Sequence, residues 1–236
     1  MTKQTVLIGY LFDGQPHLLS EALAQWMEAS ARYTAFIEIY RDKIRKKIRV
    51  NRQPESFLDL RSELEVAYRL LNDPRLEVAY EPYASAKRRG PDFAVTYRAN
   101  LVFNIEVARI RMEKNGVDEI DRLRMEERIL RILVYKLGQV KPGMPNLLVI
   151  HTREDQAQSI DLGRLMRDVK TRVEKKDSAF YAASAYPSPA AFYKDFHLLN
   201  GVLLWAAGTQ VWVNKTARYR LPDKVFRLVS SLFSDG

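Results

Sequence analysis

Cysteine is absent from this chain of 236 residues, and histidine is scarce. Without cysteine, disulfides, zinc sites built on thiolates and cysteine nucleophiles are excluded. The three histidines, His17, His151 and His197, lie far apart and lack the spacing of metal ligands, so a histidine zinc site is not expected. A chain free of cysteine also suits the reducing conditions of the cytoplasm.

Long apolar runs are missing as well. The best candidate, residues 198–207, is shorter than the roughly 20 residues that a membrane-spanning helix needs. Residues 1–10 hold one lysine and a short apolar run, which is not the pattern of a signal peptide. Glycine-rich phosphate-binding motifs and serine nucleophile elbows are not found. We therefore expect a soluble cytoplasmic protein without a membrane partner.

Positive charge is in excess, with 38 Lys and Arg against 29 Asp and Glu, a net charge of +9. Such an excess favours polyanions, because each neutralised phosphate releases condensed counterions. Residues 41–49 hold six basic side chains, and 87–89 form a basic turn. We interpret both as contacts to DNA, with a solvated helix face as the alternative for the first. The predicted contact residues are Lys43, Arg45, Lys46, Lys47, Arg49, Lys87, Arg88 and Arg89.

Hydrophobic periodicity predicts helices and strands in a mixed order. Helices are expected at 16–50 (two, joined near 29–33), 56–71, 122–137, 160–176 and 222–233, and strands at 76–83, 91–98, 101–108, 146–151, 198–207 and 210–214. Residues 3–12 are predicted to be a short strand or an irregular lead-in. This order indicates an α/β fold in which helices flank a central mixed sheet. We expect an N-terminal helical extension at 1–52 and a second domain at 53–236.

Three acidic residues fall where catalytic carboxylates are often placed. Glu63 lies on the helix of 56–71, and Asp92 opens the second strand. Glu106 lies near the end of the third strand, which is otherwise mostly apolar. A hairpin brings the ends of two adjacent strands into contact, so Asp92 and Glu106 are predicted to meet. A carboxylate in an apolar strand is costly unless it is paired or binds a metal. The structural alternative is an ion pair between Glu106 and Arg109 or Arg111.

These residues resemble the motifs of the PD-(D/E)XK nuclease superfamily. The resemblance covers roughly residues 56–151 and rests on Pro91-Asp92, on Glu106-Val107-Ala108, and on Glu63 followed by Val66, Ala67, Leu70 and Leu71. Glu65 is expected to face solvent. The resemblance implies a restriction-endonuclease-like three-layer core and hydrolysis of DNA with Mg²⁺ or Mn²⁺, by an endonuclease in preference to an exonuclease. It also implies that Asp92, Glu106 and Glu63 hold the metal.

One departure from the family pattern decides how the site is interpreted. The family places a lysine two residues after the second acid, and here that position is Ala108. Some members supply the lysine from the following helix, which points to Lys136, with Gln139 on the same helix face. The alternative is that Lys136 and Gln139 merely finish a helix, where a cation suits the helix dipole. Arg109 is a second substitute, but it alternates to the opposite side of the strand.

Two further hypotheses stay open beside an active nuclease. A catalytically inactive member of the same fold would act as a DNA-binding or protein-interaction module, since fold alone does not guarantee activity. An interaction subunit would use its N-terminal helices for oligomerisation, for example as a homodimer. In that case Tyr40, Ile44 and Ile48 would form the stripe that faces a partner.

Overall fold

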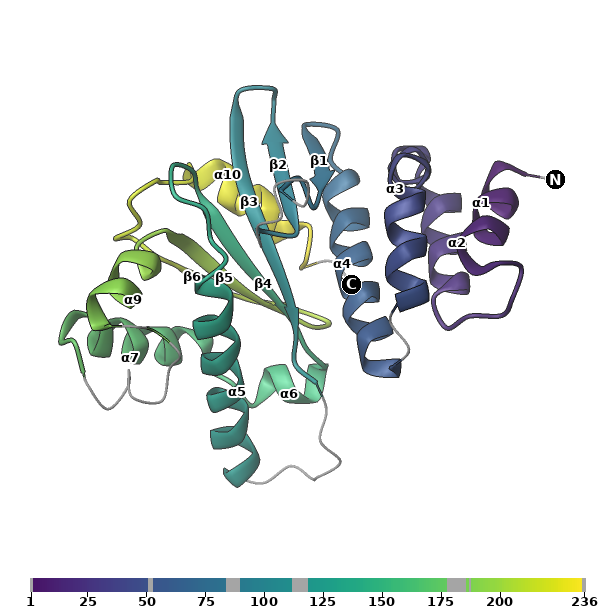
Figure 1. Ribbon diagram of the computed structural model, residues 1–236. Coiled ribbons are helices and arrows are strands. Elements are labelled where there is room, and N and C mark those ends of the chain that lie inside the picture. The colour runs from purple at the N-terminus through teal and green to yellow at the C-terminus, as the bar shows by residue number, and fades with distance from the viewer. Residues whose placement is uncertain are drawn as a thin grey trace.

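The central element of the fold is a six-stranded mixed sheet (Figure 1). The structure is a computed structural model. It describes residues 2–50, 53–83, 90–111, 119–177, 186 and 188–234, without the side chains of 119–122. Neighbouring strands in the sheet are also neighbours in the sequence. The strands are β1 (Leu76–Tyr80), β2 (Phe93–Tyr97), β3 (Leu101–Arg109), β4 (Asn146–His151), β5 (Leu199–Trp205) and β6 (Thr209–Val213). The chain therefore has the α/β fold that the sequence predicts.

Strand direction divides the sheet into three parts. Strands β1, β2 and β3 are antiparallel, β3, β4 and β5 run parallel, and β6 returns antiparallel to β5. Parallel neighbours need a crossover connection, and helix α5 (Glu119–Leu137) lies in the one between β3 and β4. Strands β4 and β5 are buried on both faces, which explains their apolar runs at 147–150 and 201–205.

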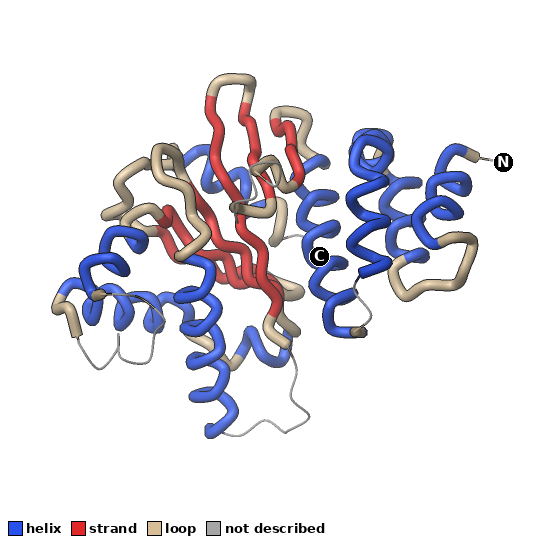
Figure 2. The backbone as a smooth tube through the Cα atoms, in the orientation of Figure 1, coloured by secondary structure: helices blue, strands red, loops and turns tan. Residues whose placement is uncertain are grey.

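Helices cover both faces of the sheet (Figure 2). Along β3, Phe103, Ile105 and Val107 join the apolar cluster shared with α4 (Pro54–Leu71) and α10 (Asp223–Ser231). The opposite face packs against α5, α7 (Leu162–Glu174) and α9 (Pro189–Phe196). Because side chains alternate along a strand, Glu106 and Ala108 face the α5 side.

Three N-terminal helices lie beside α4, at the right of Figure 1. They are α1 (Lys3–Phe12), α2 (Ser20–Ala29) and α3 (Ala31–Val50). Their buried side chains belong to the same apolar cluster as those of α4 and of the sheet. The division of the chain at residue 52 remains a prediction. No helix in the described part of the chain is long and apolar enough to cross a membrane.

Several expectations need correction. Residues 3–12 are a helix, because the Thr2 hydroxyl accepts a hydrogen bond from the Thr5 amide at 3.2 Å and caps the first turn. Ile44 and Ile48 are buried in the core, so they do not form a stripe that faces a partner. Two short helices, α6 (Glu154–Gln158) and α9, were not expected. Other element bounds lie within a few residues of those predicted.

Candidate active site

Asp92 and Glu106 meet at the entry of the β2–β3 hairpin. Phe93 pairs with Ile105, which places the preceding Asp92 opposite Glu106. The Asp92 amide donates to Glu106 Oε2 at 3.1 Å, and the Val107 amide donates to Asp92 Oδ2 at 2.8 Å. Two reciprocal backbone bonds therefore fix both carboxylates, and the predicted meeting of these residues is confirmed.

Lys136 reaches this carboxylate pair from α5. Its Nζ lies 2.6 Å from Glu106 Oε1 and 3.7 Å from Asp92 Oδ2. The Glu106 side chain is 4% exposed and that of Lys136 is 17% exposed, so the ion pair is largely shielded from water. Buried Leu133 and Leu137 flank Lys136 in sequence and anchor this end of α5 against the sheet. The helix packing thereby delivers a lysine to the two acids.

The structural alternative for Glu106 is wrong, because its cationic partner is not an arginine. Arg109 forms ion pairs with Glu55 and Asp59 of α4, the latter at 3.0 Å. Arg111 pairs with Asp59 at 2.5 Å. Arg109 therefore lies on the opposite side of β3 from Glu106, as strand alternation predicts.

Glu63 lies close to this pair but has partners of its own. Its Oε2 accepts a hydrogen bond from Lys47 Nζ at 2.7 Å and another from the Tyr80 hydroxyl at 2.6 Å. Lys47 also bonds Glu81 at 2.7 Å. Lys47 belongs to α3, so the N-terminal helices supply a cation to the site. Lys47 was expected on a DNA-contacting surface, and its contacts with Glu63 and Glu81 were not predicted, because both partners are distant in sequence.

Burial and mutual repulsion shift the protonation of all three acids. Burial, and then the charge of Glu106, raise the pKa of Asp92 to about 6. Burial, and then the charge of Asp92, raise the pKa of Glu63, and burial likewise raises the pKa of Glu106. Burial opposes the charged form of Lys136, yet attraction from Asp92 and Glu106 outweighs it and leaves its pKa raised.

The donor chemistry of the cluster fits a hard divalent cation. Mg²⁺ prefers carboxylate oxygens, and three carboxylates that repel one another gain from an added positive charge. Among the described residues, however, no group of three or more acidic, histidine or cysteine side chains is arranged to hold a metal ion. A metal ion would therefore be held mainly by the Asp92–Glu106 pair, because Glu63 already accepts hydrogen bonds from Lys47 and Tyr80.

A cavity of about 310 Å³ opens beside the cluster. Glu63, Ala108 and Lys136 all line it, together with Ile132 and Tyr135. The position where the family pattern has its lysine therefore faces the same space as the lysine of α5. A small group such as a phosphate could approach Lys136 from this cavity.

Gln139 and His151 lie outside this arrangement. Gln139 follows the end of α5 and is half-buried, and within the described part of the chain its side chain makes no hydrogen bond to Asp92, Glu106 or Lys136. His151 Nδ1 is 2.7 Å from the Ser62 hydroxyl, and its ring stacks on Trp205. Burial, and then the charge of Arg109, lower the pKa of His151 to about 4.

The basic run of α3 is largely neutralised by acids from elsewhere in the chain. Asp13 pairs with Arg45 and Arg49, and Lys43 lies 3.7 Å from Glu81. Lys46 is exposed. Lys87, Arg88 and Arg89 lie outside the described residues.

Glu65 was expected to face solvent, but its side chain is only 17% exposed, so this side of α4 is covered as well. Glu65 forms an ion pair with Arg69 at 3.5 Å.

No protein-family model, no curated protein and no solved structure matches this chain.

Proposed function

We propose that this chain is a metal-dependent deoxyribonuclease with a PD-(D/E)XK-type core, taking Mg²⁺ or Mn²⁺. The order α4, β1, β2, β3, α5, β4, in which β3 and β4 are parallel, supports the restriction-endonuclease-like assignment. The positive net charge of +9 supports a nucleic-acid substrate. An endonuclease is favoured over an exonuclease, on the resemblance alone.

The observation that carries the proposal is the position of Lys136. Its amine lies 2.6 Å from Glu106 Oε1, and Lys136 and Ala108 line the same cavity. A buried lysine that touches two acids with raised pKa values is typical of a catalytic cluster. The lysine missing from β3 is thus supplied by α5, at a place from which its charge can act on a bound phosphate.

Each residue of the cluster takes a defined part in phosphodiester hydrolysis. Asp92 and Glu106 would hold the metal ion, and Glu63 would assist them. When bound, Mg²⁺ supplies Lewis-acid polarisation of the phosphate and lowers the pKa of water. Lys136 stabilises the negative charge that develops as the water oxygen bonds to phosphorus and the ester P–O bond breaks. The backbone amides of Asp92 and Val107 keep the two carboxylates oriented.

A second candidate is a catalytically inactive protein of the same fold that binds DNA or another protein. One observation favours it: in the described part of the chain, no three acids are arranged around a common metal position. Lys47 and Lys136 instead act as the counter-ions of the acids. A buried network of this kind can also serve a purely structural purpose.

A cleavage assay separates these two candidates. Purified wild-type protein is incubated with linear, circular and single-stranded DNA in Mg²⁺ or Mn²⁺, beside Asp92→Asn and Glu106→Gln variants. We expect metal-dependent cutting by the wild type, and a loss of about 100-fold or more in each variant, since each removes a charge that acts in the transition state. Cutting of circular DNA identifies an endonuclease.

The matched control is Asp168→Asn, which removes an exposed carboxylate from α7. This variant should cut as the wild type does. Equal cutting by all four proteins would indicate a contaminating nuclease and refute the assignment of the site. DNA binding without cutting by the wild type would support the inactive module.

A further inference from the structure

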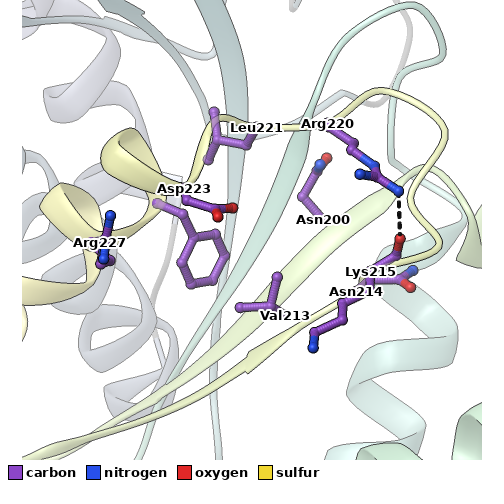
Figure 3. A pocket seen from close by; sticks show the side chains of 9 residues that line it. Asn200, Val213, Asn214, Lys215, Arg220, Leu221, Asp223 and Arg227 are labelled. Atoms are coloured by element: carbon purple, nitrogen blue, oxygen red, sulfur yellow. Dashed lines mark hydrogen bonds between the residues drawn. The ribbon is translucent and has the colours of Figure 1, made fainter.

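A second and larger cavity lies on another part of the molecule, where no role has yet been assigned. It has a volume of about 460 Å³ and is bounded by the start of β5, the end of β6 and the first turns of α10 (Figure 3). Val213, Leu221 and Phe226 supply its apolar surface, and Lys215, Arg220 and Arg227 supply positive charge. Its volume lies in the range of small-molecule sites, roughly 300 to 1,000 Å³.

The three cations of this cavity differ from those of the candidate active site. Within the described residues, none of Lys215, Arg220 and Arg227 forms an ion pair with a carboxylate, whereas Lys47 and Lys136 each do. In the described part of the chain, the Arg220 side chain makes one hydrogen bond, from Nη2 to the Lys215 carbonyl oxygen at 3.2 Å. That bond leaves most of the guanidinium donors available to a ligand. Like charges held around one cavity favour an anionic occupant.

Two polar side chains add hydrogen-bonding groups to the cavity. Asn200 is 4% exposed; its Nδ2 donates to the Tyr219 carbonyl at 2.6 Å, and its Oδ1 accepts from the Asn146 amide at 2.9 Å. The bond to Tyr219 holds the segment that carries Arg220 against β5, and the bond from Asn146 joins Asn200 to β4. Figure 3 shows the Asp223 carboxylate directed toward the side of the cavity that carries Asn200 and Arg220.

Asp223 lies in the first turn of α10, where the helix dipole stabilises its negative charge. The lining thus carries three positive charges and one negative charge. A ligand that suits it has an anionic group for Arg220 and Lys215, an apolar body for Phe226 and Val213, and a hydrogen-bond donor for Asp223.

We propose that this cavity binds a nucleotide, with its phosphate on the cations and its base against the apolar wall. Free nucleotides and the units of a nucleic-acid strand share this chemistry. The exocyclic amine or a sugar hydroxyl of the nucleotide donates to Asp223. The proposal does not depend on nuclease activity, because none of its residues belongs to the Asp92–Glu106 cluster.

Isothermal titration calorimetry in EDTA tests the proposal on the full chain. The probes are adenosine 5′-monophosphate, adenosine, inorganic phosphate and a short single-stranded oligodeoxynucleotide. We expect saturable binding of the monophosphate, the oligonucleotide or both, and weaker binding of adenosine and of inorganic phosphate. Binding of the monophosphate identifies a site for free nucleotides, and binding of the oligonucleotide alone identifies a strand-binding site.

Arg220→Gln should weaken binding about 10-fold or more, the effect of losing a charge-assisted hydrogen bond. The matched control is Arg218→Gln, which makes the same change at an exposed arginine that contacts the Tyr219 ring and does not line the cavity. Asp168→Asn, at an exposed position on α7, should bind as the wild type does. Because the titration in EDTA measures binding alone, its failure is distinguishable from a failure of DNA cleavage. The proposal is overturned if neither the monophosphate nor the oligonucleotide saturates, if inorganic phosphate binds as tightly as they do, or if both arginine variants lose affinity equally.

Discussion

The amine of Lys136 lies 2.6 Å from the carboxylate of Glu106, although thirty residues separate the two in sequence. Crossover helix α5 creates this contact, because it returns the chain across the face of β3 that carries Glu106. Ala108, two residues after Glu106, lines the same cavity as Lys136. Position 108 therefore lacks a lysine, and the helix contributes one that lines the same cavity.

Removal of Lys136 should destabilise the fold. Lys136→Met leaves two largely buried carboxylates without their cation, and we expect the free energy of unfolding at pH 7 to fall by about 3 kcal/mol. Glu106→Gln combined with Lys136→Met should cost less than the sum of the single changes, because the two residues interact directly. Urea denaturation of the four proteins measures this coupling.

The control for this cycle is Arg131→Met on the same helix. Arg131 pairs with Glu127 at 2.6 Å, but its side chain is 76% exposed, so its loss should cost less than about 1 kcal/mol. Equal decreases in the free energy of unfolding for Lys136→Met and Arg131→Met would mean that the Lys136 ion pair stabilises the fold no more than a surface pair does.

Asp92 should make stability depend on pH in a defined direction. Its pKa is raised in the folded protein from 3.8 to about 6, so between these values the folded state binds more protons than the unfolded state. Its contribution to stability is therefore present below about pH 4 and is lost as the pH rises through about 6. The loss amounts to about 3 kcal/mol, at about 1.4 kcal/mol for each pH unit of the shift.

Asp92→Asn removes this contribution, so its unfolding free energy relative to the wild type should rise between pH 4 and pH 7. Urea denaturation at several pH values follows the difference. Asp168→Asn, at an exposed position, serves as the control and should run parallel to the wild type. A constant difference between Asp92→Asn and the wild type would show that the pKa of Asp92 is not raised.

Lys47 and Lys46 are adjacent on α3 but should respond differently to the same change. Lys47 bonds Glu63 and Glu81, whereas Lys46 is exposed. Lys47→Met should lower the unfolding free energy by about 2 to 4 kcal/mol, since it leaves Glu63 without its cation. Lys46→Met should change it by less than about 0.5 kcal/mol. Thermal or urea unfolding distinguishes the two, and similar values would exclude a special role for Lys47.

Local patterns predicted much of the fold. Residues 146–151 are a strand as expected, because a strand buried on both faces is a continuous apolar run. The hairpin of β2 and β3 brings Asp92 to Glu106 through antiparallel pairing alone. Helix α1 was missed, since its ten residues carry little helical periodicity and its start depends on the Thr2 cap.

Contacts between distant segments were harder to predict. The run 41–49 holds one acid, Asp42, beside six basic residues, and folding brings Asp13, Glu63 and Glu81 to its cations. The surface of α3 therefore carries less unpaired positive charge than its sequence indicates. Lys136 could be selected beforehand only because the resemblance required a lysine and α5 had to return over β3.

The most direct test of the account is single-turnover DNA cleavage by Lys136 variants whose folding is verified by circular dichroism. With saturating Mg²⁺ or Mn²⁺, Lys136→Met should cut at least about 100-fold more slowly than the wild type, because it loses the charge that we propose stabilises the transition state. Lys136→Arg should recover part of the rate, because it keeps the positive charge. Cleavage by a folded Lys136→Met protein at the wild-type rate would contradict the assignment of Lys136 to the site.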